Sequence, residues 1–271
     1  MPINIPISAD SIFIYGYFLC VALMATVLPF YLYARDNEPS LRPHQKGLVR
    51  TETLNAFDLL GLLIFFGIYA VFLLDYLSPP PLDNQGKPQE ISITPWILAV
   101  GMVVQLVPPM LVAVMLASRG ASMSQFLGLK WKHARYLWVI TPAGVIIAYM
   151  FMFGIEYYGY SGWLEHYFGN DAMLQETVKT YQETNAVTVR IMIAISAILI
   201  APIAEEIVFR GYIYTAVKRF SGRLFATVLS SLLFGVVHFN ISALSGSIWA
   251  PISIHALFNA SQLLVQEITF H

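Results

Sequence analysis

The amino-acid sequence predicts an all-α, polytopic membrane protein of about seven transmembrane helices, with its most polar helices near the C-terminus. Hydrophobic residues make up 57% of the 271 residues and charged residues only 11%, and the mean hydropathy is +0.65. This composition is too apolar for a soluble domain of that length. The apolar residues also fall into separate runs of roughly 20, the length that a helix needs to cross a bilayer. We therefore expect residues 1–271 to form a single integral membrane domain.

The apolar runs divide into four helices within residues 1–157 and three within residues 187–267. The first four are expected at residues 11–33, 56–77, 95–118 and 136–157. The fifth begins near residue 190 and continues toward 217, and the last two are expected at 224–239 and 247–265. Between the two groups, apolar residues at helical spacing within 159–189 predict an amphipathic helix over the outer face.

Charge placement predicts the orientation of these helices. Lys and Arg gather in alternate loops, which places the first, third and fifth loops in the cytoplasm and the N-terminus outside. No Lys or Arg precedes the first apolar run, so we expect it to be a retained helix and not a cleaved signal. The net charge of −1 gives no basic surface for nucleic acid. The lone Cys20 excludes an internal disulfide and a thiolate-rich metal site.

Charged and polar residues at membrane depth lie in the last three predicted helices. They are Glu205, Glu206 and Arg210 on the fifth, His238 on the sixth, and His255 with Asn259 on the seventh. A charged side chain at the bilayer centre costs roughly 3 kcal/mol and usually marks a functional pathway. Glu206 and Arg210 are four residues apart, which predicts an ion pair. Glu205 points about 100° away around the helix and is free to face the histidines.

Helix geometry predicts that these residues meet. A turn at Ser221 and Gly222 lies midway between Glu206 and His238, so both side chains are expected roughly 24 Å of helix from that turn. Gly246 lies nearly midway between His238 and His255, which predicts a second hairpin that brings the seventh helix to the same depth. The three helices would then share one polar cluster.

The residue types in this cluster suit amide hydrolysis without a covalent intermediate. Glu205 would take a proton from a water molecule that His238 orients. His255 and Asn259, on one face of a helix, would stabilise the oxyanion. A zinc ion bound by Glu205, His238 and His255 is the alternative that these residue types leave open.

Three other protease chemistries lack their residues. No HExxH motif is present for a helical zinc site. Asp58 and Asp75 both lie at span ends, so we expect no pair of intramembrane aspartates. Ser245 beside Gly246 is typical of a turn and not of a serine nucleophile.

Three short motifs resemble the signatures of the CAAX prenyl endopeptidase and bacteriocin-processing membrane protease family. They are Glu-Glu-x-x-x-Arg at residues 205–210, Phe-x-x-x-His at 234–238 and His-x-x-x-Asn at 255–259. The resemblance covers the last third of the chain. It implies an intramembrane endopeptidase, often labelled a metalloprotease, in which Glu205 is the base, His238 lies beside it, and His255 and Asn259 bind the oxyanion. Glu206 and Arg210 would support them, and the substrate would be a membrane-associated peptide or protein, prenylated in some members.

The spacing of the second and third motifs departs from that family. Most relatives have a further apolar helix between them, whereas here only residues 239–246 precede the Ser-Ile-Trp-Ala-Pro segment. The sequence therefore predicts a final helix that runs opposite to the usual direction.

Two other functions would use the same intramembrane residues. One is a catalytically silent binding or immunity protein, in which the cluster only fixes three helices together. The other is an ion- or proton-coupled transporter, against which we find no repeat that relates two halves of the chain.

Overall fold

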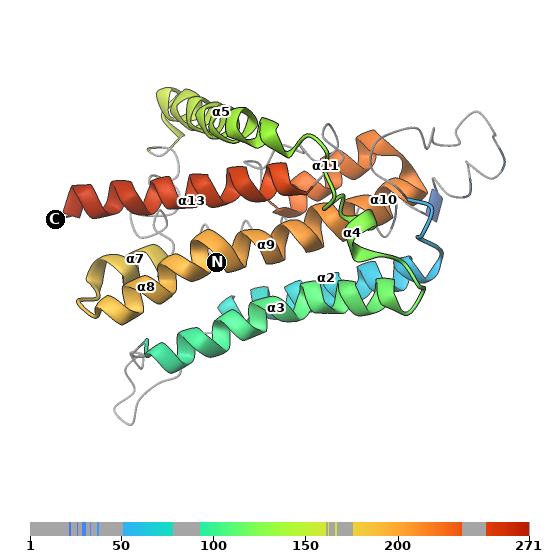
Figure 1. Ribbon diagram of the computed structural model, residues 1–271, viewed down its shortest axis with the longest axis horizontal. Coiled ribbons are helices and arrows are strands. Elements are labelled where there is room, and N and C mark those ends of the chain that lie inside the picture. The colour runs from blue at the N-terminus through green and yellow to red at the C-terminus, as the bar shows by residue number, and fades with distance from the viewer. Residues whose placement is uncertain are drawn as a thin grey trace, which may run out of the picture.

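The computed structural model describes residues 51–77, 93–160, 176–234 and 248–270, together with single positions at 22, 26, 29, 30, 33, 37, 162 and 166. Within these ranges the secondary structure is helical throughout, with short turns between helices (Figure 1). Most of the predicted first span, most of the second loop, part of the fourth loop, and His238 lie outside the described residues. The all-α membrane class is confirmed, and the count of seven spans stays a prediction.

Three predicted spans appear as α2 (Phe57–Leu77), α3 (Pro95–Ala117) and α5 (Leu137–Tyr157). α3 begins where the sequence offers a helix start, because the Thr94 hydroxyl accepts from the Ile97 amide at 3.3 Å and Pro95 follows it. Three helices in the described part are long and apolar enough to cross a membrane. They are Pro95–Ala117, Ala134–Tyr157 and Val187–Ser221, and the apolar part of α2, Phe57–Val71, is shorter.

The fifth span is one long helix with two π-helical segments inside it. It comprises α8 (Val187–Ile195), η4 (Ser196–Ile200), α9 (Ala201–Glu205), η5 (Glu206–Ile213) and α10 (Tyr214–Ser221). π-helical turns inside α-helices are rare and occur frequently at functional sites. The helix ends at Gly222, whose φ of +102° suits glycine, and α11 (Arg223–Phe234) follows at once. The predicted turn at Ser221 and Gly222 is therefore confirmed.

The last helix, α13 (Trp249–Phe270), packs along α5. Thr141 shares a hydrogen bond of 2.6 Å with Ser253, and Tyr149 shares one of 2.9 Å with Ser261. The sequence separation is the same in both pairs, so the two helices are parallel (Figure 1). At the far end of α13, Glu267 pairs with Arg190 at the start of the fifth span, so α13 is antiparallel to that span.

The direction of α13 corrects the predicted hairpin at Gly246. α11 and α13 are both antiparallel to the fifth span, so they run in the same direction. The reason lies at the start of α13, where the Ile248 amide donates to the Leu127 carbonyl at 3.1 Å and the Trp249 indole donates to the Leu129 carbonyl at 3.0 Å. These bonds hold the start of α13 beside α4 (Met123–Phe126). The parallel arrangement is the one that a further helix between the two motifs would give.

The predicted amphipathic helix appears as α7 (Glu176–Glu183). Tyr181 donates to Glu267 at 3.1 Å, and Gln182 bonds to Gln266, so α7 lies against the C-terminal end of α13. The opposite end of the bundle contains α4, the short 3₁₀ turn η2 (Ala134–Tyr136) and α10.

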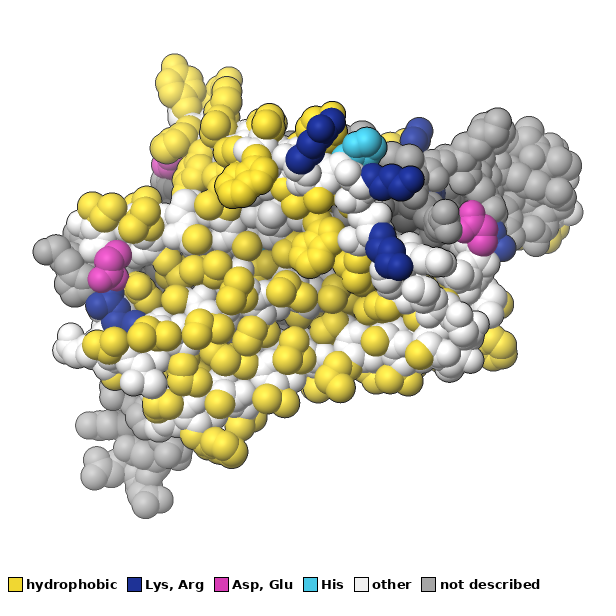
Figure 2. Space-filling model, in the orientation of Figure 1, with side chains coloured by type: hydrophobic (Ala, Val, Ile, Leu, Met, Phe, Trp, Pro, Cys, Tyr) yellow, Lys and Arg dark blue, Asp and Glu magenta, His cyan; other side chains and the backbone are white. Residues whose placement is uncertain are grey.

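Apolar side chains cover both the interior and much of the surface. Leu62, Phe65, Val112 and Val208 are among the buried residues that pack α2, α3 and η5 together. Figure 2 shows exposed apolar side chains across the middle of one face, with Lys and Arg gathered mainly toward the end that contains α4. A broad apolar surface of this kind suits contact with lipid.

Candidate active site

The centre of the predicted cluster is a buried ion pair at the start of η5. Arg210 Nε lies 3.2 Å from Glu206 Oε2, and the Glu206 side chain is 0% exposed. The pair predicted from the four-residue spacing is therefore present. Burial makes each charge dependent on the other, since an unpaired charge in an apolar surrounding is strongly destabilising.

His255 on α13 lies between the two glutamates. Its Nδ1 atom is 3.5 Å from Glu206 Oε1, and its Nε2 atom is 3.9 Å from Glu205 Oε2. Phe234 of α11 contacts the imidazole edge-on, with ring centroids 5.9 Å apart. Glu205 ends α9 and its side chain is 40% exposed, in contrast to Glu206. One imidazole thus faces an enclosed, ion-paired carboxylate and an accessible one.

Asn259 lies one turn beyond His255 and bonds to the fifth span. Its Nδ2 atom donates to the Ala197 carbonyl of η4 at 2.7 Å. This bond occupies one of the two amide hydrogens of Asn259, and the second hydrogen remains for another acceptor. The structure therefore brings Asn259 to the same helix pair as His255, and its predicted oxyanion role stays a prediction.

His238 lies outside the described residues, but the helix that leads to it is described. Phe234, four residues earlier, packs on Phe209 of η5 with ring centroids 4.6 Å apart. That contact agrees with a hairpin centred on Ser221 and Gly222. The role of His238 stays a prediction.

The zinc alternative rests on Glu205, His238 and His255. The two described members face each other across 3.9 Å and are donor types that zinc accepts. Among the residues that the structure describes, no group of three His, Cys, Asp or Glu side chains is arranged to hold a metal ion.

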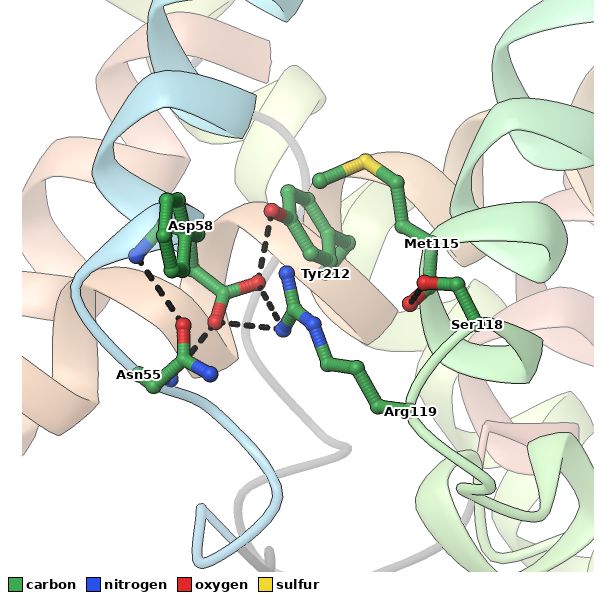
Figure 3. Close-up of polar contacts among 7 residues, drawn as sticks. Asn55, Asp58, Met115, Ser118, Arg119 and Tyr212 are labelled. Atoms are coloured by element: carbon green, nitrogen blue, oxygen red, sulfur yellow. Dashed lines mark hydrogen bonds and ion pairs between the residues drawn. The ribbon is translucent and has the colours of Figure 1, made fainter.

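A second buried polar cluster was missed by the sequence analysis. Asp58, in the first turn of α2, is fully buried. Arg119 Nη1 donates to both of its carboxylate oxygens at 2.7 and 2.6 Å, and the Tyr212 hydroxyl donates at 2.9 Å (Figure 3). The backbone amide of Asn55 donates a fourth bond, to Asp58 Oδ2, at 2.7 Å. The sequence signal that could have identified this cluster is an acid, Asp58, and an arginine, Arg119, at the same end of two neighbouring predicted spans.

Comparison with known proteins supports the resemblance seen in the motifs. Residues 187–245 match the family described as type II CAAX prenyl endopeptidase, Rce1-like. A Bacillus subtilis (strain 168) protein named "Putative membrane peptidase YdiL" is 32% identical over 147 residues, which cover 48% of this chain and 56% of that relative. The chain thus spans about half the length of the curated relative it matches. No solved structure matches.

The matched segment contains the first two motifs and ends before His255 and Asn259. The structure brings His255 of the third motif against Glu205 and Glu206 of the first. The resemblance predicted from the sequence is therefore confirmed, because residues 187–245, with the first two motifs, are similar to the Rce1-like type II CAAX prenyl endopeptidases.

Proposed function

We propose that this chain is an intramembrane endopeptidase in which Glu205 activates a water molecule to hydrolyse a peptide bond. The observation that carries the proposal is His255 between two carboxylates in unlike surroundings. A general base must be accessible to water and substrate, and Glu205 is the accessible one. Glu206 is committed to Arg210 inside the helix bundle.

Glu206 would act on the reaction through His255. A carboxylate beside Nδ1 fixes the orientation of the imidazole, which directs Nε2 at Glu205 and at the reacting carbonyl. In the proposed reaction Nε2 would carry a proton when it donates to the oxyanion. Fixing the other ring nitrogen in this way is how carboxylate–histidine pairs orient an imidazole in many hydrolases. Arg210 would hold the Glu206 carboxylate in place.

The remaining members of the proposed site are His238 and Asn259. His238 would orient the attacking water, and Asn259 would add its second amide hydrogen to the oxyanion site with His255. If a zinc ion is bound, Glu205, His238 and His255 would hold it, and the ion would supply Lewis-acid activation of the water.

The proposed substrate is a peptide or protein at the membrane surface, with prenylated C-terminal peptides as first candidates. The family match supports the prenylated candidates, and the name of the Bacillus subtilis relative supports a peptide or protein at the membrane. A silent binding protein and a transporter are the competing outcomes.

The test is incubation of the purified, reconstituted protein with matched prenylated and non-prenylated peptides in water enriched in ¹⁸O, with and without a strong zinc chelator. Hydrolysis by an activated water predicts one ¹⁸O in each new carboxyl terminus. Cleavage that resists chelation supports the glutamate mechanism without metal, and loss on chelation supports the zinc alternative. Absence of cleavage across the peptide set contradicts the proposed activity.

A further inference from the structure

The buried network of Asp58, Arg119 and Tyr212 lies outside the proposed site, but Tyr212 belongs to η5, the π-helical segment that also carries Glu206 and Arg210. Asp58 and Tyr212 are both fully buried, and they join α2 to η5. Burying a carboxylate is expensive, and apolar residues of similar size often hold helices together as well or better. A fully bonded polar network instead specifies one relative position of the groups that it joins.

The pocket around the Tyr212 hydroxyl is shaped by a glycine. A Cβ atom on Gly61 would lie 2.1 Å from that hydroxyl and 2.5 Å from Met115 Cε, so only glycine leaves room for it. The Tyr212 ring also packs against Phe65, with centroids 5.3 Å apart. The tyrosine is therefore fixed by contacts on its ring as well as by its bond to Asp58 (Figure 3).

Tyr212 and the site arginine occupy one π-helical segment, η5, which spans Glu206–Ile213. π-helical turns are rare and occur mostly as single turns inside α-helices. We therefore expect the side-chain positions of η5 to depend on contacts with neighbouring helices. At the start of η5, Glu206 faces His255. Toward its end, Tyr212 bonds to Asp58. Arg210 lies between these two attachments.

The connection after α3 contacts both helices of the proposed site. Arg119 reaches η5 through Asp58 and Tyr212. The Leu127 and Leu129 carbonyls accept bonds from the start of α13, the helix that carries His255. The short segment 119–129 is thus linked both to η5, which carries Glu206, and to α13, which carries His255.

We propose that Asp58, Arg119 and Tyr212 are positioning residues, which hold η5 where Arg210 meets Glu206 and Glu206 meets His255. This proposal rests on the proposed peptidase function. The residues touch no reacting atom, so their loss should slow the chemical step and leave substrate binding unchanged.

Tyr212→Phe and Tyr214→Phe form a matched pair. Both tyrosines are fully buried, and the Tyr214 hydroxyl takes no part in the Asp58 network. A small misplacement of catalytic groups lowers rates by about 10- to 100-fold, so we expect that fall in kcat for Tyr212→Phe, with KM unchanged. Tyr214→Phe should keep the wild-type kcat. A Tyr212→Phe variant that is less stable to heat but fully active would overturn the proposal.

Gly61→Ala and Gly67→Ala test the same contact without removing the hydroxyl. An added Cβ at Gly67 meets nothing within 4 Å, whereas at Gly61 it displaces Tyr212. Gly61→Ala should reproduce the kcat loss, and Gly67→Ala should not. The Gly61→Ala/Tyr212→Phe double variant should lose little beyond either single change, because both break one contact. Independent, multiplying losses would contradict the proposal.

Hydrogen exchange separates this proposal from the proposed function. In detergent, peptides that cover 206–213 should exchange faster in Tyr212→Phe and Gly61→Ala than in the two control variants. If the wild type cleaves no peptide, the peptidase proposal fails, and faster exchange confined to this segment still supports the holding role. Unchanged exchange in both test variants overturns the holding role, whether or not the wild type cleaves.

Discussion

The two buried polar clusters of this protein differ in how completely their charges are satisfied. Asp58 accepts bonds of 2.6 to 2.9 Å from Arg119, Tyr212 and the Asn55 amide. Glu206 is just as buried, yet neither of its oxygens accepts a well-formed hydrogen bond from a described residue. Its polar contacts, to Arg210 and His255, are 3.2 and 3.5 Å long.

This difference in hydrogen bonding agrees with the different roles that we propose for the two clusters. Buried polar groups are nearly always hydrogen-bonded, and each exception needs a reason. A closed network resists rearrangement, whereas a loosely satisfied carboxylate beside an imidazole can tighten when a substrate arrives. The contacts of Glu206 therefore support its place in the proposed active site, and those of Asp58 support the proposed holding role.

Removing the arginine from each cluster should affect stability unequally. Arg210→Ala leaves Glu206 buried beside no cation, so we expect a loss of about 3–5 kcal/mol in the free energy of unfolding. Arg119 is 20% exposed, and Asp58 keeps its bonds to Tyr212 and Asn55, so Arg119→Ala should lose about 1.5–3 kcal/mol. Denaturation of the reconstituted variants followed by tryptophan fluorescence measures both. Equal losses would remove the distinction between the clusters.

A smaller effect is expected where the third motif meets η4. Asn259→Ala removes the bond to the Ala197 carbonyl, and interhelical side-chain bonds in membranes average about 0.6 kcal/mol, with a maximum of about 1.7. We therefore expect a stability loss within that range. If Asn259 also binds the oxyanion, kcat should fall by about 100- to 1,000-fold. A fall in kcat no larger than the stability change explains would assign Asn259 to packing alone.

The smallest effect is expected at the end of the bundle that contains α7. Glu267→Gln breaks the ion pair between Glu267 and Arg190. The Glu267 side chain is 44% exposed, and exposed ion pairs contribute about 0–1 kcal/mol to stability. The variant should keep wild-type kcat and lose at most that much stability, as read from its melting temperature. A large loss of activity would show that α7 and this end of α13 take part in the site.

Sequence patterns within one helix predicted much of this arrangement. The spans at 95–118 and 136–157, the turn at Gly222 and the Glu206–Arg210 pair all follow from local spacing. The positions of the π-helical segments do not follow from local spacing, because an apolar run is compatible with both α- and π-helical turns. In η4 the Ala197 carbonyl accepts a bond from Asn259, and a contact between residues so far apart in the chain is not visible in local sequence patterns.

Two further features, the direction of α13 and the partners of Asp58, depend on long-range contacts that a single sequence does not reveal. The direction of α13 depends on bonds from Ile248 and Trp249 to the connection after α3. The sequence predicts only that Asp58 lies at the end of a span, because nothing near it along the chain identifies Arg119 and Tyr212 as its partners. Within the candidate site, the convergence of His255 with both glutamates was predicted at the right depth, although the predicted hairpin was wrong.

The most direct measurement is the cleavage rate of Glu205→Gln beside Glu156→Gln, an exposed glutamate at the end of α5, with melting temperatures recorded for both. Loss of a general base lowers a rate by about 100- to 10,000-fold, so Glu205→Gln should lose that much activity at an unchanged melting temperature, and Glu156→Gln should cleave like the wild type. A Glu205→Gln protein that is folded and cleaves at the wild-type rate would contradict the assignment of Glu205 as the base.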